Sequence, residues 1–290
     1  MAGLRIRHFT DPGCPWAFSA EPQRQRLRWL FGEQLAWETR MVVLARRPAD
    51  YEEKGFTPRE QAASFALMQR RFGMPIDARE RPRMAATAPA CRAVVAVRRH
   101  APELAEALLR RLRVRTMAGE LLDEAETVSG AAAEAAIDPS LLRRWLAEPE
   151  VDVALEEDAA LSRDPAPAAR ALDHKLAPSE DGGRRYTCPS LEIRSAEGRL
   201  LALPGYQPFE AYDVAVANLA PELERRPSPD SVEEALAWAG EPLATAEVAA
   251  LCGLEPAAAR EALARVAVER PVGADGWWSL ETAASTRQAA

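Results

Sequence analysis

The first 44 residues constrain the fold most, because they predict a strand, a helix and a second strand in that order. Residues 4–9 alternate apolar and basic side chains, which is the period-two pattern of a strand. Residues 20–31 place apolar side chains at helical spacing, and residues 36–44 form another apolar run. Two strands joined through a helix favour a parallel crossover. We therefore expect an α/β fold.

A cysteine stands where the first strand gives way to the helix, in the sequence FTDPGCPWAF of residues 9–18. Pro15 is preferred in a first helical turn, so Cys14 is expected at a helix N-terminus. Free amide groups and the helix dipole stabilise a thiolate there, and the thiolate is the nucleophilic form of cysteine. The alternative is a buried structural cysteine, and these local features do not choose between the two.

A second feature is the strand-like run YTCPSLEI of residues 186–193. Its Pro189 cannot donate to a sheet ladder and belongs at an edge, a bulge or a cis bend. Together, the DPxCPW and TxPSL motifs resemble the DsbA-like branch of the thioredoxin superfamily. More narrowly, they resemble its FrnE-type members, which are related to 2-hydroxychromene-2-carboxylate isomerases. The resemblance spans residues 3–225.

The resemblance implies an α/β thioredoxin-like fold with a helical insertion, in which a redox-active cysteine faces a cis-proline loop. It implies that Cys14 is the nucleophile and that Pro189 is the cis-proline. The other residues that it implies for the substrate site are Pro15, Trp16, Thr187 and Cys188. It also allows a homodimer.

The chain departs from the FrnE-type pattern at Ala17, where the usual Cys-Pro-Trp-Cys motif has its second cysteine. A dithiol enzyme needs a second thiolate to release a mixed disulfide. One alternative is a monothiol enzyme with glutathione or another small thiol as the resolver. In a second, Cys188 resolves the mixed disulfide, provided that the two thiols reach the close spacing that a disulfide demands. In a third, redox chemistry is lost and the cleft serves binding or isomerisation.

Three functions therefore stay open, led by a cytosolic thiol-disulfide oxidoreductase of DsbA/FrnE type that acts on a protein disulfide, a small thiol or an electrophile. The second is a glutathione-dependent isomerase or kappa-type glutathione transferase. Such relatives often carry serine at the position of Cys14, so the cysteine favours thiol chemistry. The third is a non-catalytic binding protein that recruits a partner through its C-terminal tail.

Size and charge exclude several classes of protein. The 290 residues, 48% hydrophobic and 28% charged, suffice for one large domain and a small one. A net charge of −7 gives no general attraction to nucleic acid or an anionic membrane.

The four cysteines lie far apart, and the three histidines lack ligand spacing, so no metal site or secreted disulfide scaffold is predicted. We see no signal peptide and no apolar run that would span a bilayer, and we expect a cytoplasmic protein.

The chain divides into a DsbA-like domain at residues 1–226 and a smaller domain at residues 231–282. Within the first, residues of about 58–162 are rich in strong helix formers and correspond to the helical insertion. In the second, Ser231 and Glu234 form a capping box, and a hairpin is expected over residues 268–280.

The element order of the small domain resembles a winged helix, with helices over 231–239, 245–251 and 256–266. A recognition helix would carry Arg260 and Arg265. Residues 231–280 hold eight acidic and three basic side chains, however, and duplex binding relies on neutralising phosphates. Nucleic acid is therefore not an expected partner, and a docking or dimerisation module is the alternative.

Several single residues carry weaker predictions. Asp11 would raise the pKa of a nearby Cys14. Cys91 and Cys252 are expected to be buried. Trp277 and Trp278 are expected to pack or to form an interaction patch. The arginines that would supply cations for glutathione carboxylates, unless they are simply solvated, are Arg46, Arg47, Arg70 and Arg71.

Overall fold

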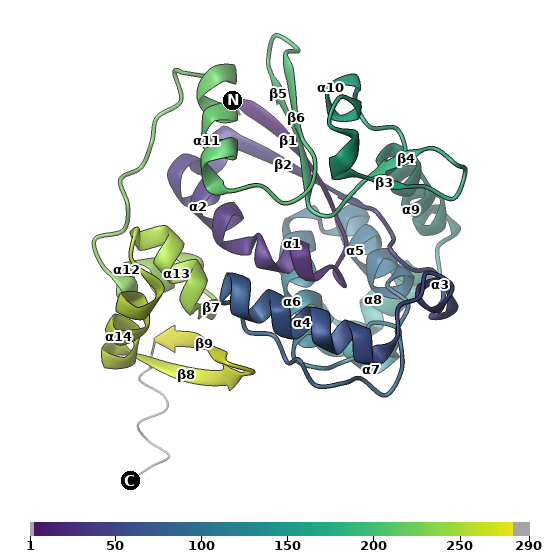
Figure 1. The fold of residues 1–290 in the computed structure, drawn as a ribbon, viewed down its shortest axis with the longest axis horizontal. Helices are drawn as coiled ribbons and strands as arrows, with labels where there is room; N and C mark the ends of the chain where they lie inside the picture. Colours follow the sequence, from purple (N-terminus) through teal and green to yellow (C-terminus); the bar gives the residue numbers. More distant parts are fainter. Residues whose placement is uncertain (1–2, 281–290) are drawn as a thin grey trace.

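A four-stranded sheet forms the centre of the protein, whose computed structural model describes residues 3–280 (Figure 1). Its strands lie in the order β2-β1-β5-β6. Their bounds are Leu4–Thr10 for β1, Leu35–Met41 for β2, Ser190–Ser195 for β5 and Leu200–Leu203 for β6. Strands β1 and β2 pair in parallel, while β5 pairs antiparallel with both β1 and β6. The parallel crossover expected from the sequence is confirmed.

The crossover contains two helices, α1 (Pro15–Ser19) and α2 (Glu21–Phe31). Helix α2 packs on the sheet together with α11 (Phe209–Leu219), and Leu27 and Val216 share an apolar core with Ile6 of β1. The predicted second strand, residues 36–44, ends early at Met41. Val43 has a φ of 59°, which turns the backbone away from the extended conformation.

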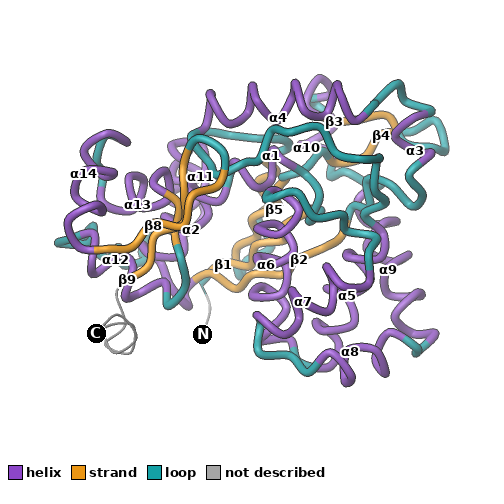
Figure 2. Tube along the Cα trace, turned by 90° about the horizontal axis from the view of Figure 1, so that it is seen from below, coloured by secondary structure: helices purple, strands orange, loops and turns teal. Residues whose placement is uncertain are grey.

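The helical insertion follows β2 and builds its own apolar core. After the short helix α3 (Ala49–Glu52), its helices are α4 (Pro58–Phe72), α5 (Ala88–His100), α6 (Ala105–Met117), α7 (Ala125–Glu134), α8 (Pro139–Leu146) and α9 (Pro149–Ser162). Val94, Leu108 and Leu142 belong to this core, which reaches the sheet at Met41. Helices α5, α7, α8 and α9 gather at one end of the molecule (Figure 2).

The chain returns to the sheet through short elements. These are α10 (Pro167–Arg170), a 3-10 turn at Asp173–Lys175, β3 (Leu176–Pro178) and β4 (Arg184–Tyr186). Two further 3-10 turns lie earlier in the chain, at Gly32–Gln34 before β2 and at Pro102–Leu104 before α6. Strands β3 and β4 form a separate antiparallel pair. Each of these strands has three residues, which is too short to show a period-two pattern in the sequence.

Residues 232–280 form helices and a small sheet at the opposite end of the molecule from α5, α7, α8 and α9 (Figures 1 and 2). The elements are α12 (Val232–Ala239), β7 (Leu243–Ala244), α13 (Thr245–Cys252), α14 (Pro256–Val266), β8 (Ala267–Val272) and β9 (Asp275–Leu280). The expected helices and hairpin are confirmed, and Ser231 accepts a hydrogen bond from the Glu234 amide. The two-residue strand β7, which pairs with β9, was not predicted.

This C-terminal unit is packed firmly on the rest of the protein. Trp277 is 2% exposed, and its ring lies 6.0 Å from that of Phe18 in α1. Arg110 of α6 donates to both carboxylate oxygens of Glu247 in α13, at 2.6 and 2.7 Å. Both of these charged side chains are buried. Trp278 is buried as well, so these tryptophans serve packing and do not form an exposed patch.

A close approach fixes the hairpin turn against α4. Gly273 has a φ of 63°, and a Cβ there would lie 2.1 Å from the Ile76 carbonyl oxygen. Only glycine fits both the left-handed backbone and this contact. In the described part of the chain, no helix combines the length and the apolar character needed to cross a membrane.

Candidate active site

The Cys14 side chain stands at the start of α1. Its backbone is extended, with φ −81° and ψ 114°, and Pro15 opens the helix behind it. The Gly13 amide donates to an Asp11 carboxylate oxygen at 2.7 Å, which closes the turn that presents the cysteine. A Cβ at Gly13 would lie 2.6 Å from the Thr87 methyl carbon, so glycine is needed beside the thiol.

The loop that precedes β5 faces this thiol from the other side. The peptide bond between Cys188 and Pro189 is cis. The Cys14 sulfur lies 3.4 Å from the carbonyl oxygen of Cys188, to which a thiol can donate. Cys14 is 5% exposed and Cys188 is 7% exposed, and both are free thiols. The structure thus places these residues, 174 positions apart in the sequence, against each other.

The electrostatics of the two thiols differ in direction. The pKa of Cys14 is lowered, first by a hydrogen bond from the Cys188 side chain and further by the backbone amides of Ala17 and Trp16. Burial and the charge of Asp11 oppose this decrease. The pKa of Cys188 is raised well above its usual range by burial and by the neighbouring Cys14. Cys14 is therefore the better thiolate of the pair.

A buried polar cluster that the sequence analysis missed surrounds Asp11. One Asp11 oxygen accepts hydrogen bonds from the Leu44 amide and the Thr87 hydroxyl, both at 2.8 Å, and the Cys91 thiol lies 3.4 Å away. Asp11 is fully buried. Burial and Asp11 raise the pKa of Cys91 well above its usual range, so this thiol is inert. Thr87 stands directly before α5, and a proline in the first turn of α5 marks a helix start. This local pattern does not predict a contact with Asp11, which lies 76 residues earlier in the sequence.

The other predicted site residues occupy different settings. Trp16 is 39% exposed and lies at the protein surface two positions beyond Cys14. Pro15 is half-buried in the first turn of α1. The Thr187 hydroxyl donates to the Lys175 carbonyl oxygen at 2.8 Å and is thus engaged with the backbone. Pro189 is buried beside Ala17, on the side of the loop that faces α2.

Several weaker predictions are also decided by the structure. Cys91 is buried, as expected, whereas Cys252 is only half-buried at the end of α13, because the turn after it opens to solvent. Partial burial still raises the pKa of Cys252 to about 11. Burial and the charge of Arg113 lower the pKa of His8 to about 3. Among residues 3–280, no group of three or more histidine, cysteine or acidic side chains could hold a metal ion.

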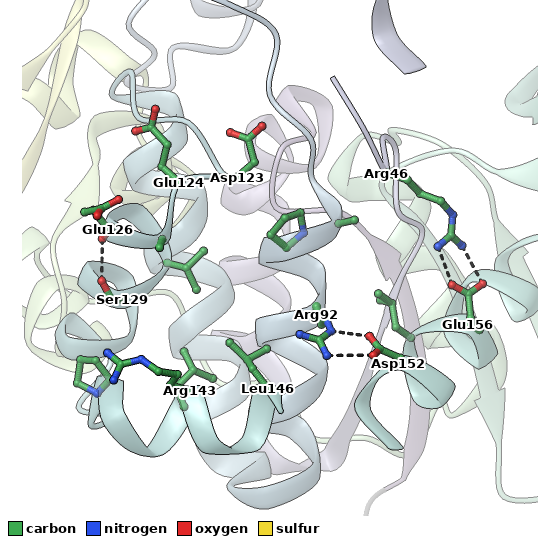
Figure 3. Close-up of a pocket in the computed structure, with 17 residues that line it drawn as sticks. Arg46, Arg92, Asp123, Glu124, Glu126, Ser129, Arg143, Leu146, Asp152 and Glu156 are labelled. Carbon is green, nitrogen blue, oxygen red and sulfur yellow. Dashed lines mark hydrogen bonds and ion pairs between the residues drawn. The ribbon is translucent and has the colours of Figure 1, made fainter. Parts of the chain in front are cut away.

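The largest cavity described lies away from the thiols. It measures about 780 Å³ and is bordered by helices of the insertion. Arg92 and Asp152 form an ion pair on one side of it, next to the pair of Arg46 and Glu156 (Figure 3). No cysteine borders this cavity, so it is separate from the thiol site.

Several solved structures share the fold of this protein. A candidate DsbA oxidoreductase from Streptomyces coelicolor has a TM-score of 0.55 and 17% identity over 78% of this chain and 93% of its own. The cytosolic disulfide reductase DsbM from Pseudomonas aeruginosa has a TM-score of 0.52 and 17% identity over 74% of this chain and 100% of its own. A candidate protein disulfide isomerase from Nitrosomonas europaea has a TM-score of 0.56 and 16% identity over 74% and 97%.

No protein-family model and no curated relative matches the sequence. At such low identities the structural likeness shows the fold alone. The protein has an α/β thioredoxin-like fold with a helical insertion, like these DsbA-type structures. The matches cover about three quarters of the chain. They confirm the fold that the sequence predicted, which is a thioredoxin-like fold with a helical insertion.

Proposed function

We propose that the protein is a thiol-disulfide oxidoreductase with a single nucleophilic sulfur, that of Cys14. The observation that carries this proposal is the sulfur itself, held at a helix N-terminus opposite the cis peptide before Pro189 and with a lowered pKa. The fold shared with DsbA-type structures supports the same chemistry. Pro15, Trp16, Thr187 and Pro189 would border the bound substrate.

The reaction is a thiol-disulfide exchange. The Cys14 thiolate attacks one sulfur of a substrate disulfide, so that a new S–S bond forms while the old one breaks. The departing sulfur leaves as a thiolate and takes a proton from water. Cys14 is then held in a mixed disulfide, because the buried Ala17 offers no thiolate to release it.

An external small thiol is the resolver that the site favours. Its thiolate attacks the substrate-derived sulfur of the mixed disulfide, which restores the Cys14 thiolate and yields a small disulfide. Cys188 is the less suitable resolver, because its raised pKa keeps it protonated. Glutathione is our proposed thiol, and the DsbM protein of Pseudomonas aeruginosa has been solved with glutathione. That protein is described as cytosolic, which supports a cytoplasmic location for this one.

We infer a structural role for the C-terminal unit. Its element order supports a winged-helix-like interpretation. The cations that DNA binding would need are already engaged, since Arg260 pairs with Glu269 and Asp275. Arg265 pairs with Glu261 on the same helix.

Alkylation by iodoacetamide tests the proposal on the intact protein. We expect Cys14 to react faster than Cys252 near pH 7, although Cys252 is the more exposed, because only the thiolate reacts. Cys14→Ser should abolish glutathione-dependent disulfide reduction, whereas Cys252→Ser, the matched control, should leave it unchanged. A Cys14 thiol with a pKa of about 8.5 or above would contradict the proposal.

A further inference from the structure

The four arginines singled out by the sequence occupy unequal settings. Arg46 is held by Glu156 in a two-pronged ion pair at 2.6 and 2.8 Å. Arg47 is held by Asp50 at 3.0 Å. Arg70 and Arg71 are both exposed, and neither forms an ion pair with a residue in the 3–280 range. Two of the four cations are therefore available for a ligand.

Arg71 differs from Arg70 in being fixed beside the thiol site. Its guanidinium carbon lies 5.9 Å from the centre of the Trp16 ring and 5.1 Å from that of Phe72. Stacking on aromatic faces is a favoured setting for arginine, and it leaves the N–H edge free to bind a carboxylate with two parallel hydrogen bonds. No such contacts hold the side chain of Arg70 in the described structure.

The aromatic cluster around Arg71 joins three separate segments. Trp16 lies 5.6 Å from Phe72 and 6.0 Å from Tyr206, measured between ring centres. The Tyr206 hydroxyl accepts a hydrogen bond from the Gln23 amide at 2.8 Å. Helix α1, the end of α4 and the loop after β6 thus hold the cation in place next to the segment that carries Cys14.

We propose that Arg71 binds a carboxylate of the disulfide that reacts at Cys14, and so selects small carboxylate-bearing disulfides. This inference rests on the proposed function. Both thiols are nearly buried, which favours a small flexible substrate over a folded protein. Trp16, whose ring Arg71 faces, lies two positions beyond Cys14 in the same first turn of α1, so the cation and the sulfur stand at the same end of this helix.

The test compares two disulfides at about 0.15 M salt. Glutathione disulfide carries carboxylates, and 2-hydroxyethyl disulfide is neutral. The readout is the ratio of the second-order rate constants for forming the mixed disulfide at Cys14, followed by mass spectrometry. Arg71→Gln should lower this ratio about 10-fold, because it removes a partly exposed hydrogen bond between charged groups. Arg70→Gln, which removes the same charge one position away, should leave the ratio unchanged.

The outcomes separate this inference from the proposed function. If Cys14 reacts with neither disulfide, the proposed function fails. If Cys14 reacts but Arg71→Gln leaves the ratio unchanged, the inference about Arg71 is overturned. If Arg71→Gln lowers the rate constants for both disulfides equally, Arg71 has a structural role. If Arg71→Gln and Arg70→Gln change the ratio equally, the effect is one of general charge. Either result overturns the inference about Arg71.

Discussion

At the scale of single residues, three groups around one sulfur decide the chemistry. Cys188 and the amides of α1 favour the Cys14 thiolate, and Asp11 opposes it. Ala17 leaves the thiolate without a neighbour on its own helix that could release a mixed disulfide. Under the proposed function, this combination of a favoured thiolate and no second thiol in the usual place would make the cycle depend on an outside thiol.

Replacing Ala17 should restore the missing partner. In Ala17→Cys we expect oxidation to join Cys14 to the introduced thiol, because the Ala17 amide already faces the Cys14 sulfur. Peptide mass mapping of the protein oxidised with glutathione disulfide measures this. The wild-type protein and the Ala17→Ser control should instead carry glutathione on Cys14. Glutathione on Cys14 in Ala17→Cys as well would contradict the expected geometry.

Removing the charge of Asp11 should strengthen the nucleophile. Asp11 raises the pKa of Cys14, so in Asp11→Asn that pKa should fall below the wild-type value. The pH dependence of iodoacetamide alkylation measures the shift, with circular dichroism to check folding. Asp138→Asn removes an exposed charge from the insertion and serves as the control. A Cys14 pKa that rises in Asp11→Asn would show that hydrogen bonds to Asp11 matter more than its charge.

At the scale of elements, turns decide how neighbouring segments meet. Val43 ends the second strand early, and the next amide, that of Leu44, bonds to Asp11 instead of a strand. The hairpin turn at Gly273 likewise brings β8 and β9 against α4 and Ile76. Such contacts are set by tertiary neighbours, so the periodicity of the segment itself does not reveal them.

Two glycines test the docking of the hairpin. Gly273 and Gly253 have nearly the same φ, at 63° and 66°, but a Cβ at Gly253 meets open space. Both Gly→Ala variants should lose about 1–2 kcal/mol from the left-handed backbone. Gly273→Ala should lose a further 1–3 kcal/mol or so, because its Cβ collides with the Ile76 carbonyl. Urea unfolding measures both, and equal losses would contradict the docking contact.

At the scale of the whole molecule, buried charges join the C-terminal unit to the thioredoxin-like body. Arg110 contacts Glu247 of α13 and also lies 3.6 Å from Glu21 of α2. Glu21 in turn pairs with Arg113, which donates to the Thr10 hydroxyl next to Asp11. The network therefore runs from the C-terminal unit to the segment that presents Cys14.

Breaking the central pair of this network should be costly. Arg110→Met leaves the Glu247 carboxylate buried without its partner, which should lower the free energy of unfolding by about 3–5 kcal/mol. Arg46→Gln, in an exposed pair, should cost less than about 1 kcal/mol. Urea unfolding measures both. The double variant Arg110→Met, Glu247→Leu should recover part of the loss, and a single variant as stable as wild type would refute the linkage.

The pH dependence of stability should expose the buried His8. Its folded pKa of about 3 lies below the unfolded value of 6.5. Between these two pH values, only the unfolded chain binds a proton at His8. The contribution of neutral His8 to the free energy of unfolding is therefore complete above pH 6.5. It declines by up to about 1.4 kcal/mol per pH unit as the pH falls below 6.5. Urea unfolding at about pH 7 and about pH 5 measures the slope. His8→Gln should flatten it, and an unchanged slope would assign it to other groups.

The sequence by itself determined the features that depend on near neighbours. The crossover, the helix start at Cys14, the cap at Ser231 and the helix over residues 256–266 all follow from periodicity and capping within a few residues. The departure at Ala17 was also visible there, once the motif's resemblance was recognised.

Only the tertiary structure decided which distant groups share a microenvironment. The contacts of Asp11 with Thr87, of Arg71 with Trp16 and of Arg110 with Glu247 each join different elements. Local patterns cannot determine them, because they depend on how the insertion and the C-terminal unit fold back on the sheet. The same packing removes water from Cys14 and Cys188, which by itself raises the pKa of both thiols. Their mutual contact and the amides of α1 then separate the pKa values of two chemically identical groups.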